Sequence, residues 1–205
     1  MSYTITDHWL DGVTRKPDNL GPSLVEPDLL VVHYTVTTSG PATARDLADE
    51  SQRASVHLVV DHDGSVIQQV PFDRVAWHAG KSTWGGRTTC SLFSIGIEVV
   101  NLGPLKKSGD GFVDVYGRPY KGPAPVEAKH KDPNCRYRFW EPYPEEQMQA
   151  LLELGRLLVA SYGLREIVGH DDIAPGRKID PGPAFPMEDY RAAVMGPSLH
   201  EEQVA

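Results

Sequence analysis

Leu29-Leu30-Val31-Val32-His33 is a continuous apolar run that ends in a histidine, and it decides the expected fold. A strand that is apolar at every position is typical of the interior of a parallel sheet, where helices cover both faces. The next segment, Pro41 to about Gln52, predicts a helix that begins at a proline. Because strands and helices alternate along the chain, we expect an α/β domain with a central mixed β-sheet flanked by helices.

The other expected elements are strands at 55–60, 65–70 and 93–100 and helices at 144–162 and 186–194. Asp63-Gly64 lies between the first two of these strands and favours a hairpin. Alternation along the third strand places Ser94, Gly96 and Glu98 on one face. The small neighbours of Glu98 leave room for a ligand there.

The chain is expected to form one main domain, residues 29–195, preceded by an irregular arm at 1–28 and followed by a flexible tail at 196–205. Within the domain, residues 101–143 show weak periodicity and many turn formers, which indicates a long insertion loop. Its aromatic residues either pack on the domain or form a lid or groove wall.

Bulk composition excludes several classes of protein. The net charge of −8 argues against nucleic acid and anionic membranes as partners, and no apolar run is long enough for membrane insertion. The N-terminus has neither a basic nor an apolar signal region, so we expect synthesis in the cytoplasm. Cys90 and Cys135 are expected to be free thiols, and the protein is expected to be a monomer.

The segment from Gly169 to Pro183 carries the densest chemistry in the chain, with His170, Lys178 and Asp180 in a loop rich in glycine and proline. Two histidines and one aspartate form a three-ligand zinc set that leaves a fourth position for water, as in catalytic zinc sites. His33, at the end of the first strand, can complete that set.

A zinc hydrolase also needs a base and a positive group for the developing oxyanion. Glu98 can be the base, and Lys178 shares a face with Asp180 if the segment is extended. Each residue alone has a more ordinary interpretation: a core histidine, a turn-forming aspartate, a solvated lysine, an exposed glutamate. Spacing alone leaves both interpretations open.

Five ordered segments strengthen the zinc interpretation, and together they extend over about residues 29–195. In them the chain resembles the zinc-dependent N-acetylmuramoyl-L-alanine amidases of the type-2 family, which share a fold with peptidoglycan recognition proteins. The matching segments are Val31-Val32-His33-Tyr34-Thr35, Ala54 to Val60, Ala76-Trp77-His78-Ala79-Gly80, Ser94 to Glu98, and Gly169 to Pro183.

The resemblance implies one catalytic Zn²⁺ held by His33, His170 and Asp180, with Glu98 as the general base and Lys178 polarising the scissile carbonyl. The bond cleaved would join N-acetylmuramic acid to L-alanine. Asp180 stands where recognition proteins carry a cysteine, so the chain resembles the bacterial branch that includes the anhydro-muropeptide amidase.

Five further residues are expected to bind substrate. Trp77 and His78 lie in a loop that the family uses as a groove wall, and Asn101, Arg177 and His57 are weaker candidates with structural alternatives. Arg177 could pair with a carboxylate of the stem peptide.

Two alternative functions remain at this point: a catalytically silent peptidoglycan-binding module, and a zinc peptidase that cuts within the stem peptide. The expected partner is peptidoglycan or an anhydro-muropeptide, and the sequence does not decide between sacculus and soluble substrate. Action on the cell wall would need release through a holin or another non-classical route.

Overall fold

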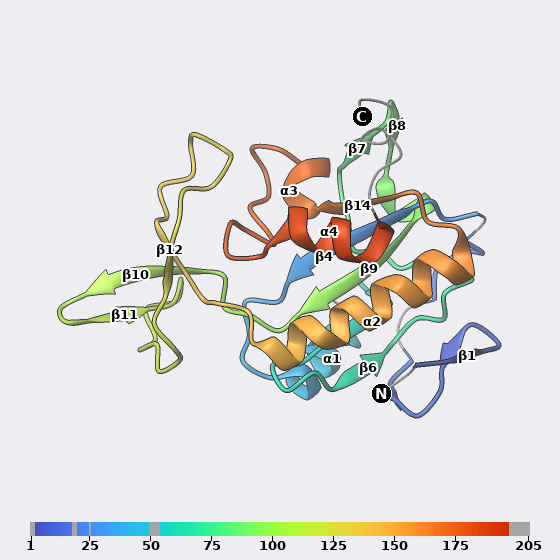
Figure 1. Ribbon diagram of the computed structural model, residues 1–205, viewed down its shortest axis with the longest axis horizontal. Coiled ribbons are helices and arrows are strands. Elements are labelled where there is room, and N and C mark those ends of the chain that lie inside the picture. The colour runs from blue at the N-terminus through green and yellow to red at the C-terminus, as the bar shows by residue number, and fades with distance from the viewer. Residues whose placement is uncertain (1–2, 18–19, 25, 50–53, 197–205) are drawn as a thin grey trace.

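The computed structural model of the protein describes residues 3–17, 20–24, 26–49 and 54–196. Six strands form the central sheet in the order β14-β4-β9-β5-β6-β3 (Figure 1). All neighbours in it are parallel except β5 and β6, which form the predicted hairpin, so the sheet is mixed as expected. The strands are β3 (Thr14–Arg15), β4 (Leu29–Tyr34), β5 (Leu58–Val60), β6 (Val66–Gln68), β9 (Ser94–Val99) and β14 (Glu166–Gly169).

Strand β4 is buried along its whole length because packed layers cover both faces of the sheet. Leu30 and Val32 point into the larger core cluster, whereas Leu29 and Val31 belong to a second cluster on the opposite face. Since side chains alternate along a strand, His33 lies on the face of Leu29 and Val31. The apolar run therefore presents a histidine on the side away from the larger core.

Helix α2 crosses one face of the sheet and supplies most of the helical part of the larger core (Figure 1). Glu145 and Glu146 occupy its first turn, and Gly163 ends it in the left-handed conformation that glycine adopts without steric cost. The helices are α1 (Gly40–Leu47), α2 (Glu145–Tyr162), α3 (His170–Ile173) and α4 (Met187–Met195), with a 3₁₀ turn at Cys90–Phe93.

The N-terminal segment is more ordered than an irregular arm. It contains a hairpin of β1 (Ile5–Thr6) and β2 (Trp9–Leu10), followed by β3, which joins the edge of the central sheet. Leu10 is completely buried in the larger core. Part of the segment before residue 29 therefore belongs to the domain. The sequence does not predict this, because strands of two residues leave no periodic pattern.

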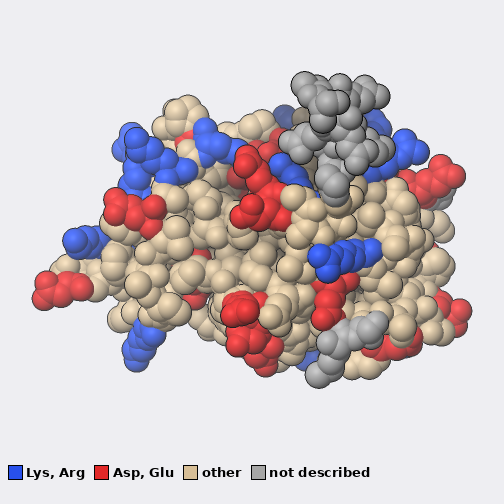
Figure 2. All heavy atoms as spheres, viewed as in Figure 1, with Lys and Arg blue, Asp and Glu red and all other residues tan. Residues whose placement is uncertain are grey.

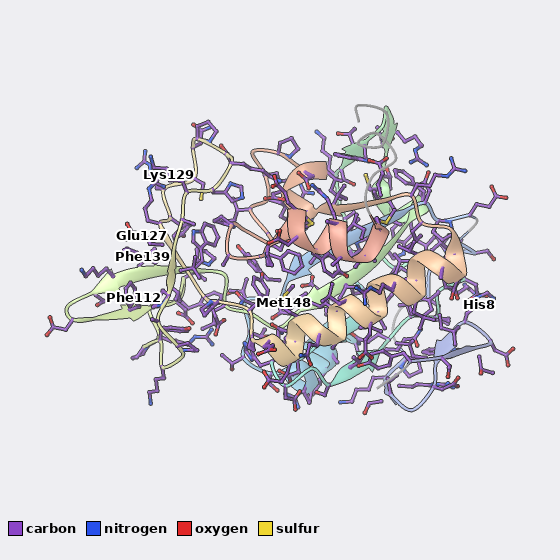
Figure 3. The ribbon with its side chains drawn as sticks, viewed as in Figure 1. His8, Phe112, Glu127, Lys129, Phe139 and Met148 are labelled. Carbon is purple, nitrogen blue, oxygen red and sulfur yellow. The ribbon has the colours of Figure 1, made fainter. Side chains whose placement is uncertain are left out.

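The expected insertion at 101–143 also has elements of its own. Its four strands form a separate antiparallel sheet in the order β11-β10-β13-β12, which projects from one side of the domain (Figure 1). Figure 3 shows Phe112 and Phe139 on this projection, where their rings meet edge to face with centroids 5.0 Å apart. The insertion strands are β10 (Pro104–Ser108), β11 (Gly111–Val113), β12 (Val126–Glu127) and β13 (Phe139–Trp140), and a separate hairpin pairs β7 (Thr83–Trp84) with β8 (Arg87–Thr88).

Cys90 is buried and Cys135 is partly buried, and both are free thiols as expected. The tail predicted at 196–205 lies outside the described residues from 197 onward. Among the described residues, no helix combines the length and hydropathy needed to cross a membrane.

Candidate metal centre and active site

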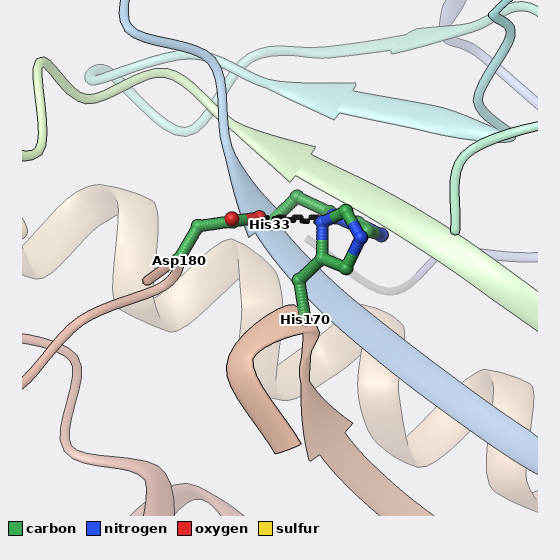
Figure 4. Close-up of side chains that lie close together, drawn as sticks. All are labelled: His33, His170 and Asp180. Carbon is green, nitrogen blue, oxygen red and sulfur yellow. Dashed lines mark hydrogen bonds and ion pairs between the residues drawn. The ribbon is translucent and has the colours of Figure 1, made fainter. Parts of the chain in front are cut away.

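Three buried side chains converge at the carboxyl edge of the central sheet (Figure 4). His33 is the penultimate residue of β4, His170 directly follows β14, and Asp180 lies in the loop after α3. His33 Nδ1 and His170 Nδ1 are 2.8 Å apart, and Asp180 Oδ2 is 3.2 Å and 3.0 Å from them. The structure thus brings together the three residues that the sequence predicts as metal ligands.

The fold fixes these positions through strand register and one loop contact. β14 and β4 are parallel neighbours, with Gly169 beside Val32, so His33 and His170 leave the sheet at the same edge. The backbone N–H of Asp171 donates to the carbonyl of Asp180 at 2.8 Å, which closes the loop between the second and third ligands.

A chain of hydrogen bonds determines which nitrogen of His33 carries the proton. The Ser94 hydroxyl donates to the Cys90 carbonyl at 2.7 Å, so its oxygen accepts from His78 Nε2 at 3.2 Å. His78 Nδ1 is then an acceptor, and His33 Nε2 donates to it at 2.9 Å. His33 Nδ1 therefore presents a lone pair toward His170 and Asp180.

His170 has the same arrangement. Its Nε2 lies 3.1 Å from the carbonyl oxygen of Ala79, which only accepts, and 3.3 Å from Arg177 Nη2. Both hydrogens of that Arg177 nitrogen go to the carbonyls of Ala79 and Lys81, so His170 Nε2 carries the proton and Nδ1 a lone pair. Two imidazole lone pairs and a carboxylate oxygen thus face one another within 3.2 Å. Three acceptors at such distances repel unless a cation lies among them, and two histidines with one carboxylate are a donor set typical of catalytic zinc. The residues fit a metal ion.

Electrostatics in the site agree with this arrangement. Burial lowers the pKa of His33 to about 4, which keeps the imidazole neutral at pH 7. Burial opposes ionisation of Asp180, but the adjacent His170 and His33 rings hold the pKa of its carboxyl below the usual range. His33 and Asp180 are therefore in the protonation states that metal ligands require.

Glu98 lies directly beside His33, because β4 and β9 are parallel neighbours that pair these two residues. Its Oε2 atom is buried and has no hydrogen-bond partner within the described part of the chain. Burial, reinforced by the charge of Asp180 and opposed by Lys178, raises the pKa of the Glu98 carboxyl to about 8. A partly buried carboxyl with a raised pKa beside three candidate metal ligands is suited to proton transfer near neutral pH.

A cavity of about 340 Å³ opens over these residues. Glu98, His170, Lys178 and Asp180 all contribute to its walls, and Tyr34 lines it from the end of β4. The sequence-predicted base, oxyanion group and two of the ligands therefore share one space large enough for part of a substrate.

The predicted substrate-binding residues divide into two groups. His78 and Arg177 line the cavity, although the hydrogen bonds above engage both ring nitrogens of His78. Arg177 donates to the carbonyls of Ala79 and Lys81. It thereby joins the 79–81 loop to the segment 171–180, which connects His170 to Asp180 and which we call the ligand loop. Trp77 is 39% exposed and does not line the cavity itself.

Two predicted substrate contacts are structural. His57 is completely buried, accepts from the Gly96 N–H at 3.0 Å and donates to the Arg74 carbonyl at 3.0 Å, so it does not reach the cavity. Asn101 is also buried, and its amide joins the start of the insertion to the Glu141 carbonyl at its end. We correct both expectations: neither residue lines the cavity, and the side chains of both make hydrogen bonds within the domain.

Sequence reasoning missed how the insertion is fastened to the ligand loop. The backbone N–H of Asp132 donates to His130 Nδ1, so His130 Nε2 donates to Asp171 at 2.9 Å. Lys131 bridges Asp171 and Asp172. These contacts hold the insertion against the helix that begins with His170, and no motif in the sequence signals them.

Two histidines and an aspartate at the edge of an α/β sheet, beside a partly buried glutamate, form a group that could hold one metal ion, as hydrolases of this kind do. The sequence profile described as N-acetylmuramoyl-L-alanine amidase matches residues 23–183. The chain belongs to this family of amidases.

Curated relatives include the 1,6-anhydro-N-acetylmuramyl-L-alanine amidase AmpD of Salmonella typhimurium, which is 36% identical over 95% of this chain and 96% of its own. The N-acetylmuramoyl-L-alanine amidase AmiD of Escherichia coli is 32% identical over 82% of this chain and 53% of its own length.

Two solved structures show the same fold. An AmpD derivative superposes with a TM-score of 0.63 at 28% identity, covering 93% of this chain and 99% of that one. A complex of Escherichia coli AmiD with the substrate anhydro-N-acetylmuramic acid-L-Ala-D-γ-Glu-L-Lys gives a TM-score of 0.62 at 28% identity, with 94% and 65% covered.

Proposed function

We propose that this protein is a zinc-dependent amidase that hydrolyses the bond between N-acetylmuramic acid and L-alanine in anhydro-muropeptides. The observation that carries the proposal is the convergence of two imidazole lone pairs and a carboxylate beside Glu98, whose Oε2 atom has no hydrogen-bond partner among the described residues. The AmpD and AmiD relatives, which are named for this chemistry, support the substrate class.

His33, His170 and Asp180 would hold the metal. When bound there, zinc supplies Lewis-acid chemistry that activates water and polarises a carbonyl. Its positive charge would favour the ionised form of Glu98, whose pKa burial raises to about 8.

The chain's own residues then perform the proton transfers. Glu98 takes a proton from the attacking water and later gives it to the departing amine of L-alanine. Lys178, on the cavity wall, donates to the carbonyl oxygen as negative charge develops on it. His78 and Ser94 hold the His33 ring in orientation throughout.

Mass spectrometry of the products of a purified anhydro-muropeptide tests the proposal. Release of an intact stem peptide with a free L-alanine amine supports it. A cut beyond L-alanine would identify a zinc peptidase, and binding without cleavage would identify a silent binding module. Preference for sacculi over the soluble compound would correct the substrate.

Glu98→Gln is the matched control, because the amide keeps the shape of the side chain but accepts no proton. We expect this variant to retain one zinc per chain and to lose hydrolysis. Monomeric state and cytoplasmic synthesis stay predictions, which gel filtration and cell fractionation would check.

A further inference from the structure

A second cavity, of about 680 Å³, lies on the insertion side of the ligand loop. Ile179 lines both this cavity and the one over the predicted metal ligands, so the two spaces adjoin at this residue. We call this space the insertion pocket. Its walls come from β10 and the 132–139 segment, which the pairing of Leu105 with Phe139 holds together.

The insertion pocket has an apolar floor and a basic rim. Leu105, Phe139 and Ile179 supply apolar surface. The charged residues that line it are four cations, Lys106, Lys107, Arg136 and Arg138, and one carboxylate, Asp132. On the face shown in Figure 2, blue side chains gather over the part of the molecule where the insertion projects.

These cations are not neutralised by the protein. Lys106, Lys107 and Arg136 enter no ion pair with any residue that the structure describes, and all three are exposed. Lys106 Nζ lies 5.8 Å from the centroid of the Tyr137 ring, which is a cation–π contact. In a chain with a net charge of −8, a local excess of unpaired cations is suited to an anionic ligand.

We infer that the insertion pocket binds the carboxylates of the stem peptide while its L-alanine lies in the metal cavity. The inference rests on the proposed function. The AmiD ligand has glutamate linked through its γ-carboxyl, which leaves the α-carboxylate free two residues from the scissile bond. A peptide residue spans about 3.5 Å, so a stem passing over Ile179 brings this anion and the terminal carboxylate to the rim.

Steady-state kinetics with two substrates test this. The first is anhydro-N-acetylmuramic acid-L-Ala-D-γ-Glu-L-Lys, and the second is the same compound with the glutamate α-carboxyl amidated. We expect the wild-type KM to be roughly tenfold higher for the amide, with kcat unchanged. Lys106→Gln/Arg136→Gln should raise the KM for the acid about tenfold and abolish the preference.

Lys16→Gln/Arg45→Gln removes the same charge from exposed positions away from the pocket and should behave as wild type. Calorimetric binding of the tripeptide L-Ala-D-γ-Glu-L-Lys gives a readout independent of turnover, and its Kd should rise about tenfold in the pocket variant.

Equal KM values for acid and amide, or an unchanged KM in the pocket variant, would overturn the inference and leave the amidase activity standing. Cleavage of neither compound would instead refute the proposed function. Displacement of substrate by a DNA oligonucleotide but not by the tripeptide would assign the cations to a polyanion, which also overturns the inference.

Discussion

Gly96→Ala should weaken metal binding although Gly96 contacts no metal ligand. A Cβ atom at this position would lie 2.5 Å from Cγ of His78 and 2.7 Å from two further ring atoms. Ordinary contacts of this kind begin at 3.4 Å, so the ring must retreat by about 1 Å. The backbone itself accepts alanine, because Gly96 lies within β9 in an extended conformation.

A movement of this size breaks the chain that orients His33. The His33 to His78 hydrogen bond is 2.9 Å and the His78 to Ser94 bond is 3.2 Å. Adding about 1 Å takes either beyond hydrogen-bonding distance. Loss of such a contact to a ligating histidine reduces metal affinity by about 10- to 100-fold, or roughly 1.4–2.7 kcal/mol. Overpacking also costs about 1–3 kcal/mol of folding stability.

Zinc affinity is measured by competition with a chromophoric chelator, and folding by chemical denaturation of the same samples. Gly111→Ala is the matched control, since its Cβ would meet only one atom, at 4.0 Å. If the effect passes through His78, Gly96→Ala should cause no further loss in a His78→Ala background.

A folded Gly96→Ala protein with wild-type zinc affinity would refute the reasoning. So would additive losses in the double variant, since they would show that Gly96 acts on the site by a route other than the His78 ring.

The remaining predictions concern Glu98, the metal and the insertion. In metal-free protein, the raised pKa of Glu98 contributes stability that is fully present below pH 4.5 and is lost as the pH rises toward about 8. The stability of Glu98→Gln relative to wild type should therefore increase over that range, by at most roughly 5 kcal/mol. Chemical denaturation at several pH values that shows no such trend would contradict the prediction. Zinc at 1,000 times its Kd should raise the free energy of unfolding of the wild type by about 4 kcal/mol and that of the His33→Ala variant far less. Thermal unfolding with and without a chelator measures this difference. His130→Ala should cost about 1–3 kcal/mol, because it removes the buried donor to Asp171 Oδ2 and leaves that carboxylate only the contact with Lys131. The exposed neighbour Lys129 (Figure 3) should tolerate alanine, and equal stabilities of the two variants would exclude the proposed attachment.

The central strand and the long helix could be predicted because their patterns are local. Leu29–His33 is apolar at each position except its last, and the α2 sequence has both a helical stripe and a glycine stop. Strand order is not local, so the pairing of His33 with Glu98 could be expected only through resemblance to a family. The insertion strands are two to five residues long, too short for alternation to show.

The alternation of residues on β9 correctly predicts which side chains share a face, but not what occupies the space above that face. Ser94, Gly96 and Glu98 do share the face that carries the site. The space above Gly96, however, holds the His78 ring rather than a ligand. A sequence shows that a small residue leaves room, but only the fold determines which group fills it. The same limit explains why His57 looked like a candidate: the strand pattern does not show that both its ring nitrogens are used internally.

The predicted metal ligands are therefore held from two directions by groups that no substrate needs to touch. His78 and Ser94 fix the His33 ring from the sheet side, and His130 and Lys131 hold Asp171, whose backbone binds the Asp180 carbonyl. The second support comes from the insertion, which also forms the basic pocket beside Ile179. Substrate carboxylates bound in that pocket would thus contact the same segment that positions a metal ligand. Because His130 and Lys131 contact Asp171 and the rim cations Lys106 and Arg136 do not, we expect changes within the pocket rim to alter KM alone and changes at His130 to alter metal affinity as well.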